Sequence, residues 1–485
     1  MELKQLLNKI DYRIEQGSLE RVITAVVSDS RKLQEGCLFL CIEGLNFDGH
    51  SAIDQAVEKR AAAVVVGKEV EVKGDVTVIR VEDTRRAMAF ISAAWFGNPA
   101  EKLKVIGITG TKGKTTTTYL VKSILEQAGK KVGLIGTIET IIGEVHIPSN
   151  NTTPESYLLQ ETLAKMVEAG CDAVVMEVSS QGLMMHRTAG FNFDFGIFTN
   201  IEPDHIGPGE HDSFEHYLSC KNLLFKQCKV GIINGDDAHM KEIIKGHTCK
   251  IETYGFSEGT DLRAQQVELI REKGELGVEF VTTGLISLKA RVATPGKFSV
   301  YNALTAIAIC RHFEVSEENI KEALKKAKVK GRIELVKVSD EFTLMIDYAH
   351  NAMSLKSLLT TLKEYHPKRL VCLFGCGGNR SRQRRFEMGE VSGNLADLTV
   401  ITSDNPRFEE PEEIIADIVT GIQKTEGKYV TICDRKEAIA YTIKNGQPGD
   451  IIVLAGKGHE DYQEIRGVHY PMDERVMIQE ILEAR

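Results

Sequence analysis

The chain has 485 residues, of which 42% are hydrophobic and 27% charged, and its net charge is −9. At roughly 100–200 residues per domain, this length predicts about three domains of a soluble globular protein. The negative charge argues against a general nucleic-acid-binding protein, although local sites can still hold small anionic ligands.

The sequence shows no sign of membrane insertion or export. No apolar run approaches the roughly 18 residues of a membrane span, and the charged segment MELKQLLNKIDYRIEQ lacks the apolar core of a signal peptide. Ten cysteines occur without a C-x-x-C pair, which indicates buried reduced thiols. We therefore expect a cytoplasmic protein.

The apolar runs divide the chain into three regions. Residues 1–98 contain short stretches such as AVVSDS and AAAVVVG, which predict a small α/β domain, and GNPAEKLK is the expected linker. Residues 99–331 alternate strands such as VIGITG and AVVMEVSS with helices, and residues 332–485 repeat this alternation. Such alternation predicts parallel sheets, whose ligands bind beyond the carboxyl ends of the strands.

The segment GTKGKTT (110–116) follows the apolar run VIGI and precedes a helical stretch. Gly110 and Gly113 allow backbone N–H groups to face inward, and the helix directs its positive end at the same point. The standard phosphate-loop motif needs a glycine where this chain has Ile108, so we expect a variant loop.

The residues that follow these glycines suit a nucleotide. Lys114 can reach the terminal phosphates, and the hydroxyl of Thr115 or Thr116 can reach Mg²⁺. The alternative is a glycine-rich turn from strand to helix that binds no ligand.

Candidate metal ligands follow two other predicted strands. Glu177 ends AVVMEVSS, and Asp204 and His205 follow FGIFTN. Because Mg²⁺ prefers oxygen ligands, His205 would fit only as one ligand among several. Lys221 lies near the apolar face of a predicted helix (213–225), where a lysine usually extends to solvent.

Taken together, these motifs resemble the Mur ligases, the ATP-dependent amino-acid-adding enzymes of peptidoglycan synthesis. That family uses a GT-x-GKT loop in place of the standard motif, and the resemblance spans essentially the whole chain. The motifs that carry it are VSDSRKLQEGCLF (27–39), GLNFDGH (44–50), GTKGKTT, NTTPE (151–155), MEVSSQGL (176–183), TNIEPDH (199–205), HYLSCKNLLF (216–225), TPGKFSVYN (294–302), GRIE (331–334), DYAHN (347–351), FGCGGNR (374–380), SDNPR (403–407) and AGKGHEDYQ (455–463).

The resemblance implies an α/β fold with three domains. These are a small N-terminal α/β domain that binds UDP-MurNAc (1–98), a central P-loop-type parallel-sheet ATPase domain (99–331), and a C-terminal Rossmann-like domain that binds the amino acid (332–485). Three domains that share ligands are expected to open and close during turnover. We expect a monomer.

The resemblance also implies ATP and Mg²⁺ as cofactors. Lys221 matches the lysine that the family carbamylates, which turns an ammonium into a carboxylate that can bind Mg²⁺. Glu177, His205 and carbamylated Lys221 would hold one ion, and Thr115 with Glu177 would hold a second. The implied catalytic set consists of Lys114, Glu177, His205 and Lys221. The implied ATP-binding residues are Gly110, Thr111, Lys112, Gly113, Lys114, Thr115, Thr116, Asn302, Arg332, Asp347 and His350.

The implied reaction has two steps. The substrate carboxylate attacks the γ-phosphate of ATP to give an acyl phosphate and ADP, and an amine then attacks the carbonyl to give an amide and phosphate. The protein must mainly position anions and neutralise charge. By the same resemblance, Ser30 and the GLNFDGH loop would hold the uridine-diphosphate end of UDP-MurNAc-L-Ala-D-Glu, and the residues for its muramoyl-dipeptide end would be Thr152, Thr153, Ser179 and Arg187.

The segment SDNPRFEEP bears on which amino acid is added. Arg407 can form a two-point pair with a carboxylate, and diaminopimelate has a second carboxylate that lysine lacks. In the tripeptide-forming members of the family, DNPR is the pattern associated with meso-diaminopimelate, and Glu460 would pair the distal ammonium. The implied pocket consists of Arg380, Asp404, Asn405, Pro406, Arg407, Gly456 and Glu460.

The chain departs from the family pattern at several points. Gln181 replaces a histidine, Met185 replaces a glutamine, Ser299 replaces an asparagine, and the loop at 206–212 is about two residues longer than is usual. The proline that usually follows DYAHN is also absent. These changes affect details of substrate binding and leave the phosphate and metal set intact.

Other readings remain open. The same reaction could use L-lysine or another diamino acid, or the chain could be a different Mur ligase or a folylpolyglutamate-type ligase. A non-catalytic nucleotide-binding switch would give no role to Lys221. A dehydrogenase is disfavoured because the sequence lacks G-x-G-x-x-G.

Overall fold

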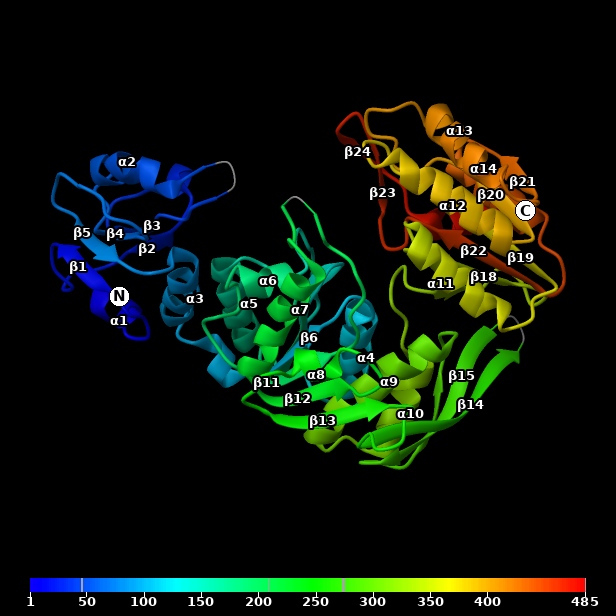
Figure 1. Ribbon diagram of the computed structural model, residues 1–485, viewed down its shortest axis with the longest axis horizontal. Helices are drawn as coiled ribbons and strands as arrows, with labels where there is room; N and C mark the ends of the chain where they lie inside the picture. The colour runs from blue at the N-terminus through cyan, green and yellow to red at the C-terminus, as the bar shows by residue number, and fades with distance from the viewer. Residues whose placement is uncertain (45–46, 208, 273–274, 485) are drawn as a thin grey trace. The chain divides into compact units, whose positions relative to one another are not determined.

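A computed structural model describes residues 1–44, 47–207, 209–272 and 275–484 (Figure 1). It contains two compact parts: Met1–Asp261 with Thr305–Val315, and Leu262–Leu304 with Ser316–Arg485. The first part holds an N-terminal α/β sheet and a central parallel sheet, and the second holds an antiparallel layer and a C-terminal α/β sheet. The predicted class, α/β with parallel sheets in three domains, is confirmed.

The N-terminal sheet is covered on both faces. Its elements are α1 (Leu3–Leu6), β1 (Arg13–Gln16), β2 (Ala25–Val27), η1 (Ser30–Lys32), β3 (Cys37–Leu40), η2 (Gly49–Ala52), α2 (Ile53–Glu58), β4 (Ala63–Val66), β5 (Thr77–Arg80) and α3 (Thr84–Trp95). The strand order is β1-β5-β4-β3-β2, with only β1 antiparallel to its neighbour. Along β3, Leu38 and Leu40 pack with α1 and α3, whereas Cys37 and Phe39 pack with α2.

The central sheet forms the rest of the first part. Its elements are η3 (Pro99–Lys102), β6 (Lys104–Thr109), α4 (Lys114–Gln127), β7 (Val132–Ile135), β8 (Glu139–Ile142), β9 (Val145–Pro148), α5 (Ser156–Glu168), β10 (Ala173–Glu177), α6 (Ser180–Met184), β11 (Phe193–Phe198), α7 (Phe214–Asn222), η4 (Leu223–Lys226), β12 (Cys228–Asn234), α8 (Met240–Ile243), β13 (Lys250–Gly255) and η5 (Arg311–Phe313). The order is β13-β12-β11-β6-β10-β7-β8-β9, parallel from β13 to β7. Residues of α5, α6 and α7 share one core with this sheet.

The second part begins with antiparallel strands and continues as an α/β sheet. Its elements are β14 (Leu262–Glu272), β15 (Glu275–Gly284), β16 (Lys289–Val292), α9 (Lys297–Cys310, which ends in the first part), α10 (Glu317–Lys326), β17 (Glu334–Val336), β18 (Thr343–Asp347), α11 (Ala352–Lys363), β19 (Arg369–Phe374), α12 (Arg382–Leu395), β20 (Leu398–Ile401), α13 (Pro411–Ile422), β21 (Tyr429–Thr431), α14 (Arg435–Lys444), β22 (Asp450–Ala455), β23 (Tyr462–Ile465), β24 (Val468–Pro471) and α15 (Glu474–Glu483).

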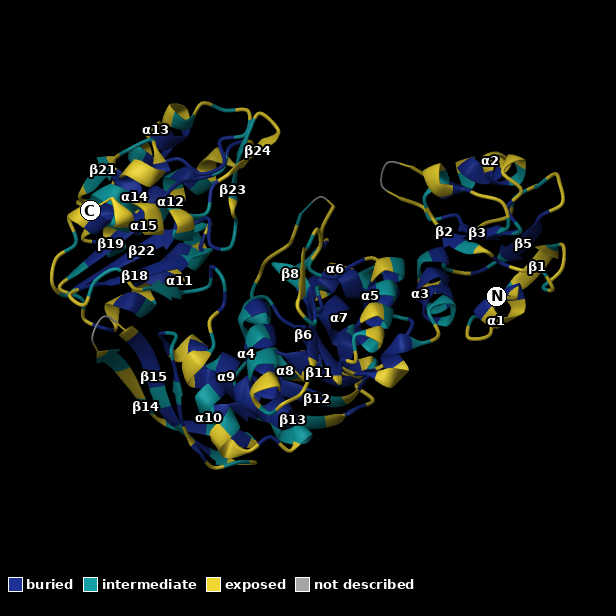
Figure 2. Ribbon diagram, turned by 180° about the vertical axis from the view of Figure 1, so that it is seen from behind, coloured by how far each residue is buried: buried dark blue, intermediate teal, exposed yellow. Residues whose placement is uncertain are grey.

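The C-terminal sheet has the order β17-β18-β22-β19-β20-β21, parallel from β18 to β21. Helices α11, α12 and α13 pack on one face, and α14 and α15 pack on the other. The strands between them are buried on both sides, as Figure 2 shows by their dark blue colour. This explains why the sequence has near-continuous apolar runs here rather than alternating ones.

The cysteines agree with the prediction of reduced thiols. All ten lie among the described residues and none forms a disulfide; nine are buried and Cys433 is half-buried. Among the described residues, no helix is long and apolar enough to cross a membrane.

Candidate active site

Three neighbouring strands of the central sheet end at one edge and bring the predicted motifs together. In the parallel register Glu177 of β10 lies beside Ile108 of β6, and Phe198 of β11 lies beside Thr109 of β6. The glycine loop, Glu177 and the segment after β11 therefore emerge side by side. This is the edge at which α/β sheets bind their ligands.

The glycine loop is shaped by the end of β11. Gly110 has φ 149°, and a Cβ there would lie 1.9 Å from Thr199 Oγ1, so only glycine fits. Asn200 binds both sides of Lys112: its Oδ1 accepts from Lys112 N at 2.9 Å and its Nδ2 donates to Lys112 O at 3.0 Å. Thr199 Oγ1 donates to the same carbonyl at 2.7 Å. Sequence reasoning assigned no role to Thr199 or Asn200, although the TNIEPDH motif contains both.

Two lysines converge on one carbonyl of this loop. Lys114 Nζ donates to Gly110 O at 2.8 Å, and Lys221 Nζ donates to the same oxygen at 3.0 Å. Lys221 is 1% exposed and lies 4.5 Å from the centre of the Tyr217 ring. Burial, followed by the charge of Lys114, lowers the pKa of Lys221 well below its usual value. The position of Lys221 on its helix suggested that it extends to solvent. In the structure it is instead buried.

The carboxylate of Glu177 is buried and oriented by a neighbouring threonine. Thr137, which follows β7, donates to Glu177 from its backbone N at 2.9 Å and from its hydroxyl at 3.0 Å. Gly136 lies close to the same carboxylate, because a Cβ there would be 2.6 Å from Glu177 Oε1. Sequence reasoning missed Thr137, because its closeness to Glu177 depends on the pairing of β7 with β10 in the sheet.

The four residues predicted for the muramoyl-dipeptide end lie beside Glu177. Thr152 Oγ1 is 3.0 Å from Thr137 Oγ1, and Thr153 Oγ1 donates to Glu177 O at 3.0 Å. Ser179 caps α6, and Arg187 donates to Thr153 O at 2.9 Å. The structure thus brings Thr152, Thr153, Ser179 and Arg187 together. Of the residues that depart from the family pattern, Gln181 is exposed and Met185 is half-buried.

Two histidines of the loop after β11 differ in their surroundings. His205 is exposed, with its Nδ1 3.1 Å from Glu210 Oε1. His211 is 2% exposed, and its Nε2 lies 2.8 Å from Ser180 Oγ. Burial, with the neighbouring His216 and Lys221, lowers the pKa of His211. Sequence reasoning passed over His211 because it belongs to the lengthened loop.

The residues predicted for the uridine-diphosphate end lie in the N-terminal sheet domain. Ser30 is the first residue of η1. The side chain of Asp29 caps this helix by accepting a hydrogen bond from Arg31 N. In GLNFDGH, the Asp48 carboxylate is 2.6 Å from both His50 Nδ1 and Lys68 Nζ, which depresses the pKa of Asp48. Leu45 and Asn46 of this motif lie outside the described residues.

In the second part, the predicted ATP contacts Arg332, Asp347 and His350 lie around Tyr348. The Arg332 guanidinium lies 4.8 Å from the centre of the Tyr348 ring, and His350 Nδ1 is 2.8 Å from Tyr348 O. Asp347 accepts from Ile333 N and Ala349 N, both at 2.8 Å. Burial is the main influence on its pKa, which is raised. Asn302 is buried in α9.

The residues predicted for the amino acid meet at the carboxyl ends of β19, β20 and β22. Asp404 and Asn405 are buried, and a Cβ on Gly456 would lie 3.0 Å from Asp404 Oδ2. Arg407 donates from Nε to Glu464 Oε2 and from NH1 to Gly378 O, both at 2.8 Å. Pro406, between Asn405 and Arg407 in the sequence, is buried, and Arg380 is exposed.

A buried lysine that sequence reasoning did not single out completes this arrangement. Lys457 is 0% exposed and donates at 2.8 Å to both Asn405 Oδ1 and Glu460 Oε2. Asn405 Nδ2 also donates to Glu460 Oε2, at 2.9 Å. Glu460, predicted to pair an ammonium of the amino acid, thus already has a cation of the chain beside it.

Comparison with known proteins places the chain in a family. Three family models match: "Mur ligase family, catalytic domain" at residues 22–96, "Mur ligase middle domain" at 108–310, and "Mur ligase, glutamate ligase domain" at 331–458. Two curated relatives, from Caldanaerobacter subterraneus subsp. tengcongensis and Clostridium acetobutylicum, are 43% and 44% identical, each over 99% of both chains. Both are named UDP-N-acetylmuramoyl-L-alanyl-D-glutamate–2,6-diaminopimelate ligase, the second with the suffix 1.

Solved structures show the same likeness. A structure of a UDP-N-acetylmuramoyl-L-alanyl-D-glutamate–2,6-diaminopimelate ligase has a TM-score of 0.74 and 27% identity, covering 100% of this chain and 99% of its own. MurF from Acinetobacter baumannii, at 20% identity and a TM-score of 0.62 over 99% of this chain and 98% of its own, shares the fold. With relatives above 40% identity along its whole length, the chain belongs to the Mur ligase family.

Proposed function

We propose that this chain is an ATP-dependent, ADP-forming ligase of peptidoglycan precursor synthesis. It would join 2,6-diaminopimelate, in the meso form, to the D-glutamate of UDP-MurNAc-L-Ala-D-Glu. The observation that carries the ligase assignment is the meeting of Lys114 and Lys221 on Gly110 O, one strand away from buried Glu177. The full-length relatives that bear this name support the choice of substrate.

The geometry of the glycine loop supports the proposed phosphate-binding role. The N-terminus of α4 and the ammonium of Lys114 both favour an anion in front of the loop. ATP bound there would have its γ-phosphate near Lys114, which would offset the charge that develops during phosphoryl transfer. Thr199 and Asn200 would act as positioning residues, since both hydrogen-bond to the backbone of Lys112 in the loop.

The residues beside the loop fit Mg²⁺. Thr115, Glu177, His205 and carbamylated Lys221 would hold the ions, whose charge would neutralise phosphoryl oxygens. Among the described residues, Thr137 is the donor to both Glu177 side-chain oxygens, which leaves that carboxylate with further lone pairs. Hard carboxylate and hydroxyl oxygens are the ligands that this ion prefers.

Carbamylation of Lys221 fits the same geometry. Within the described part of the chain, the buried Lys221 ammonium donates one hydrogen bond, to Gly110 O, and lies beside Lys114. Burial and the charge of Lys114 disfavour its charged form and lower its pKa, which favours the neutral amine. A neutral amine can attack CO₂ and lose a proton, which forms an N–C bond and leaves a carbamate. The product would replace repulsion toward Lys114 by attraction.

The remaining assignments are part of the same proposal. Residues 1–98 would bind UDP-MurNAc, 99–331 would bind ATP, and 332–485 would bind the amino acid. Ser30 would contact the uridine diphosphate, and Thr152, Thr153, Ser179 and Arg187 the dipeptide. The enzyme would act in the cytoplasm as a monomer.

A panel of amino acids tests the proposal. The chain is incubated with ATP, Mg²⁺ and UDP-MurNAc-L-Ala-D-Glu, and ADP release and amide formation are followed for each amine. Meso-diaminopimelate should give by far the highest kcat/KM. A comparable kcat/KM for L-lysine would reject the amino-acid assignment, and absence of ADP release with every amine would reject the ligase assignment.

A further inference from the structure

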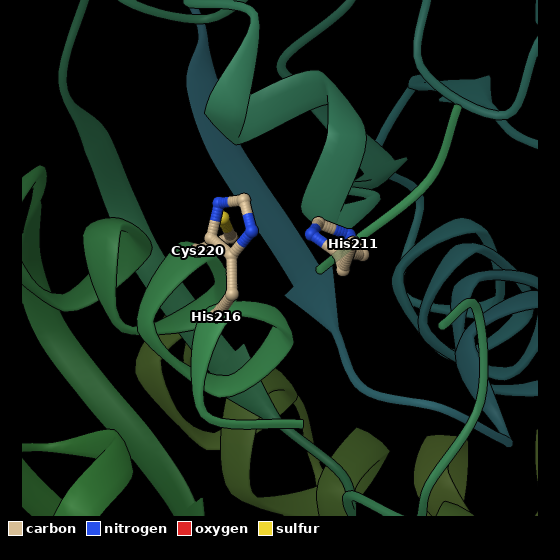
Figure 3. A group of neighbouring side chains, drawn as sticks. All are labelled: His211, His216 and Cys220. Carbon is tan, nitrogen blue, oxygen red and sulfur yellow. The ribbon is translucent and has the colours of Figure 1, made fainter. Parts of the chain in front are cut away.

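Two histidines and a cysteine form a cluster that has no part in the proposed ligase chemistry. His211, His216 and Cys220 each offer one ligand atom, two ring nitrogens and a thiol sulfur, and these atoms lie within 4.8 Å of one another. Figure 3 shows the His211 ring directed at the His216 side chain, with the Cys220 sulfur behind the His216 ring. His211 and Cys220 are buried, and His216 is half-buried.

The local chain geometry brings the three side chains together. His216 and Cys220 are one turn apart on α7 and therefore share a helix face. Ser213 caps that helix by accepting from His216 N at 3.1 Å, and the chain before the cap places His211 opposite. The two imidazole rings are 5.1 Å apart and nearly perpendicular.

His211 contributes an observation of its own. Its Nε2 has a partner in Ser180 Oγ, but its buried Nδ1 has no hydrogen-bond partner among the described residues. Buried polar atoms nearly always have a partner, so this one requires an explanation. If Nε2 carries the proton and donates to Ser180, Nδ1 presents a lone pair, which is the form in which a histidine binds a metal.

We propose that His211, His216 and Cys220 bind a transition-metal ion of the Zn²⁺ class. Imidazole and thiolate suit Zn²⁺ and Co²⁺, whereas Mg²⁺ prefers oxygen. Bond lengths of about 2.1 Å to nitrogen and 2.3 Å to sulfur place tetrahedral ligands roughly 3.5 Å apart. The side chains would therefore close slightly around the ion, and a water would take the fourth position. Cys220 would lose its proton to solvent as the metal–sulfur bond forms.

Such an ion would link the loop after β11 to helix α7. Cys220 directly precedes Lys221, and His211 contacts Ser180, which lies three residues after Glu177. The site is separate from the Mg²⁺ set of the proposed function, because it uses different residues and a different class of ligand. It does not depend on whether the chain is a ligase.

Spectroscopic titration with Co²⁺ tests the proposal on the full-length chain. Metal-free, reduced protein is titrated with Co²⁺ without oxygen, and the visible and near-ultraviolet spectra are recorded. We expect one ion per chain, the visible bands of tetrahedral Co²⁺ and a thiolate-to-cobalt charge-transfer band. Zn²⁺ should displace the cobalt, and excess Mg²⁺ should leave the spectrum unchanged.

Variants identify the ligands. Cys220→Ser should remove the charge-transfer band, and His216→Gln, at a half-exposed position, should weaken Co²⁺ binding at least about tenfold, since even partners of metal ligands contribute about that much. Cys433→Ser, which removes a half-buried cysteine elsewhere, serves as the matched control and should leave the spectrum intact. Lys221→Ala should also keep the band, even where it abolishes ligation.

Each outcome decides the matter. A wild-type spectrum without the charge-transfer band, or a band that survives in Cys220→Ser, overturns the site. If Cys220→Ser does not fold, an unchanged Co²⁺ affinity in His216→Gln overturns it instead. Loss of the band in Lys221→Ala would show that the metal occupies the ligase site rather than this cluster.

Discussion

Replacement of Thr137 by valine tests how the buried Glu177 carboxylate is held. The change keeps the branched shape and removes only the hydroxyl, which donates to Glu177 Oε2 at 3.0 Å, while the backbone N–H to Oε1 remains. A hydrogen bond to a charged group contributes about 1.5–3 kcal/mol. At about 1.4 kcal/mol per tenfold, turnover should fall roughly 10- to 150-fold if Glu177 must keep its orientation to hold Mg²⁺. Removing a residue that hydrogen-bonds to a metal ligand typically lowers metal affinity or activity by a similar factor, about 10–100-fold.

The assay follows ADP release at several Mg²⁺ concentrations. Thr137→Val should need more Mg²⁺ for half-maximal rate and recover part of its activity at high Mg²⁺, with a nearly unchanged KM for diaminopimelate. Thr137→Ser keeps the hydroxyl and should stay within a few-fold of the wild type. A Thr137→Val enzyme with wild-type rate and Mg²⁺ dependence would refute the reasoning, and thermal unfolding of both variants separates this effect from a loss of fold.

Three other substitutions probe the proposed site. Lys114→Ala should lower ligation by about 100-fold or more with an unchanged melting temperature, because its charge acts on the transferring phosphoryl group; turnover above a tenth of the wild type would contradict this. Lys221→Ala should be inactive and partly restored by bicarbonate or a short carboxylic acid, and ¹³CO₂ labelling of the active wild type should show a carbamate; an unmodified amine there would exclude it. Arg407→Ala should raise the KM for diaminopimelate by the equivalent of about 2 kcal/mol, the lower end of the range for buried charge pairs, and leave the ATP KM nearly unchanged, since it removes a half-buried charged partner; equal changes in both would argue against a pocket at Arg407.

The sequence predicted those parts of the fold and site that depend on local pattern. Alternating strands and helices predicted the parallel sheets, and the run Gly-Lys-Thr-Thr after a buried strand predicted the position of the glycine loop between β6 and α4. Parallel pairing then brings strand ends together, so the grouping of Glu177 with the loop was predictable. Burial of Lys221 was not predictable from its helix, because the face of a short helix that becomes covered depends on the segments packed against it.

Contacts between distant segments lay beyond the sequence pattern. Thr137 meets Glu177 because β7 and β10 are neighbours in the sheet, and nothing near Thr137 in the sequence announces that pairing. Lys457 appeared in the sequence only as part of the AGKGHEDYQ motif. In the structure its buried side chain, which follows β22, donates to Asn405 after β20, and β19 lies between these two strands. The loop after β11 is a third case, since the sequence does not indicate that His205 is exposed while His211 is buried.

In the proposed amino-acid pocket, the chain's own charges would influence which amino acid is preferred. Lys457 accompanies Glu460, so the pair offers an incoming ammonium less net negative charge than a lone carboxylate would. Under the proposal, discrimination between lysine and diaminopimelate would then depend on Arg407, whose guanidinium can form a two-point pair with a second carboxylate. In this structure Arg407 is paired with Glu464, and a substrate carboxylate would have to share or displace that partner. A substrate without the second carboxylate would gain nothing from Arg407, so the proposed pocket would favour diaminopimelate over lysine without any contact that repels lysine.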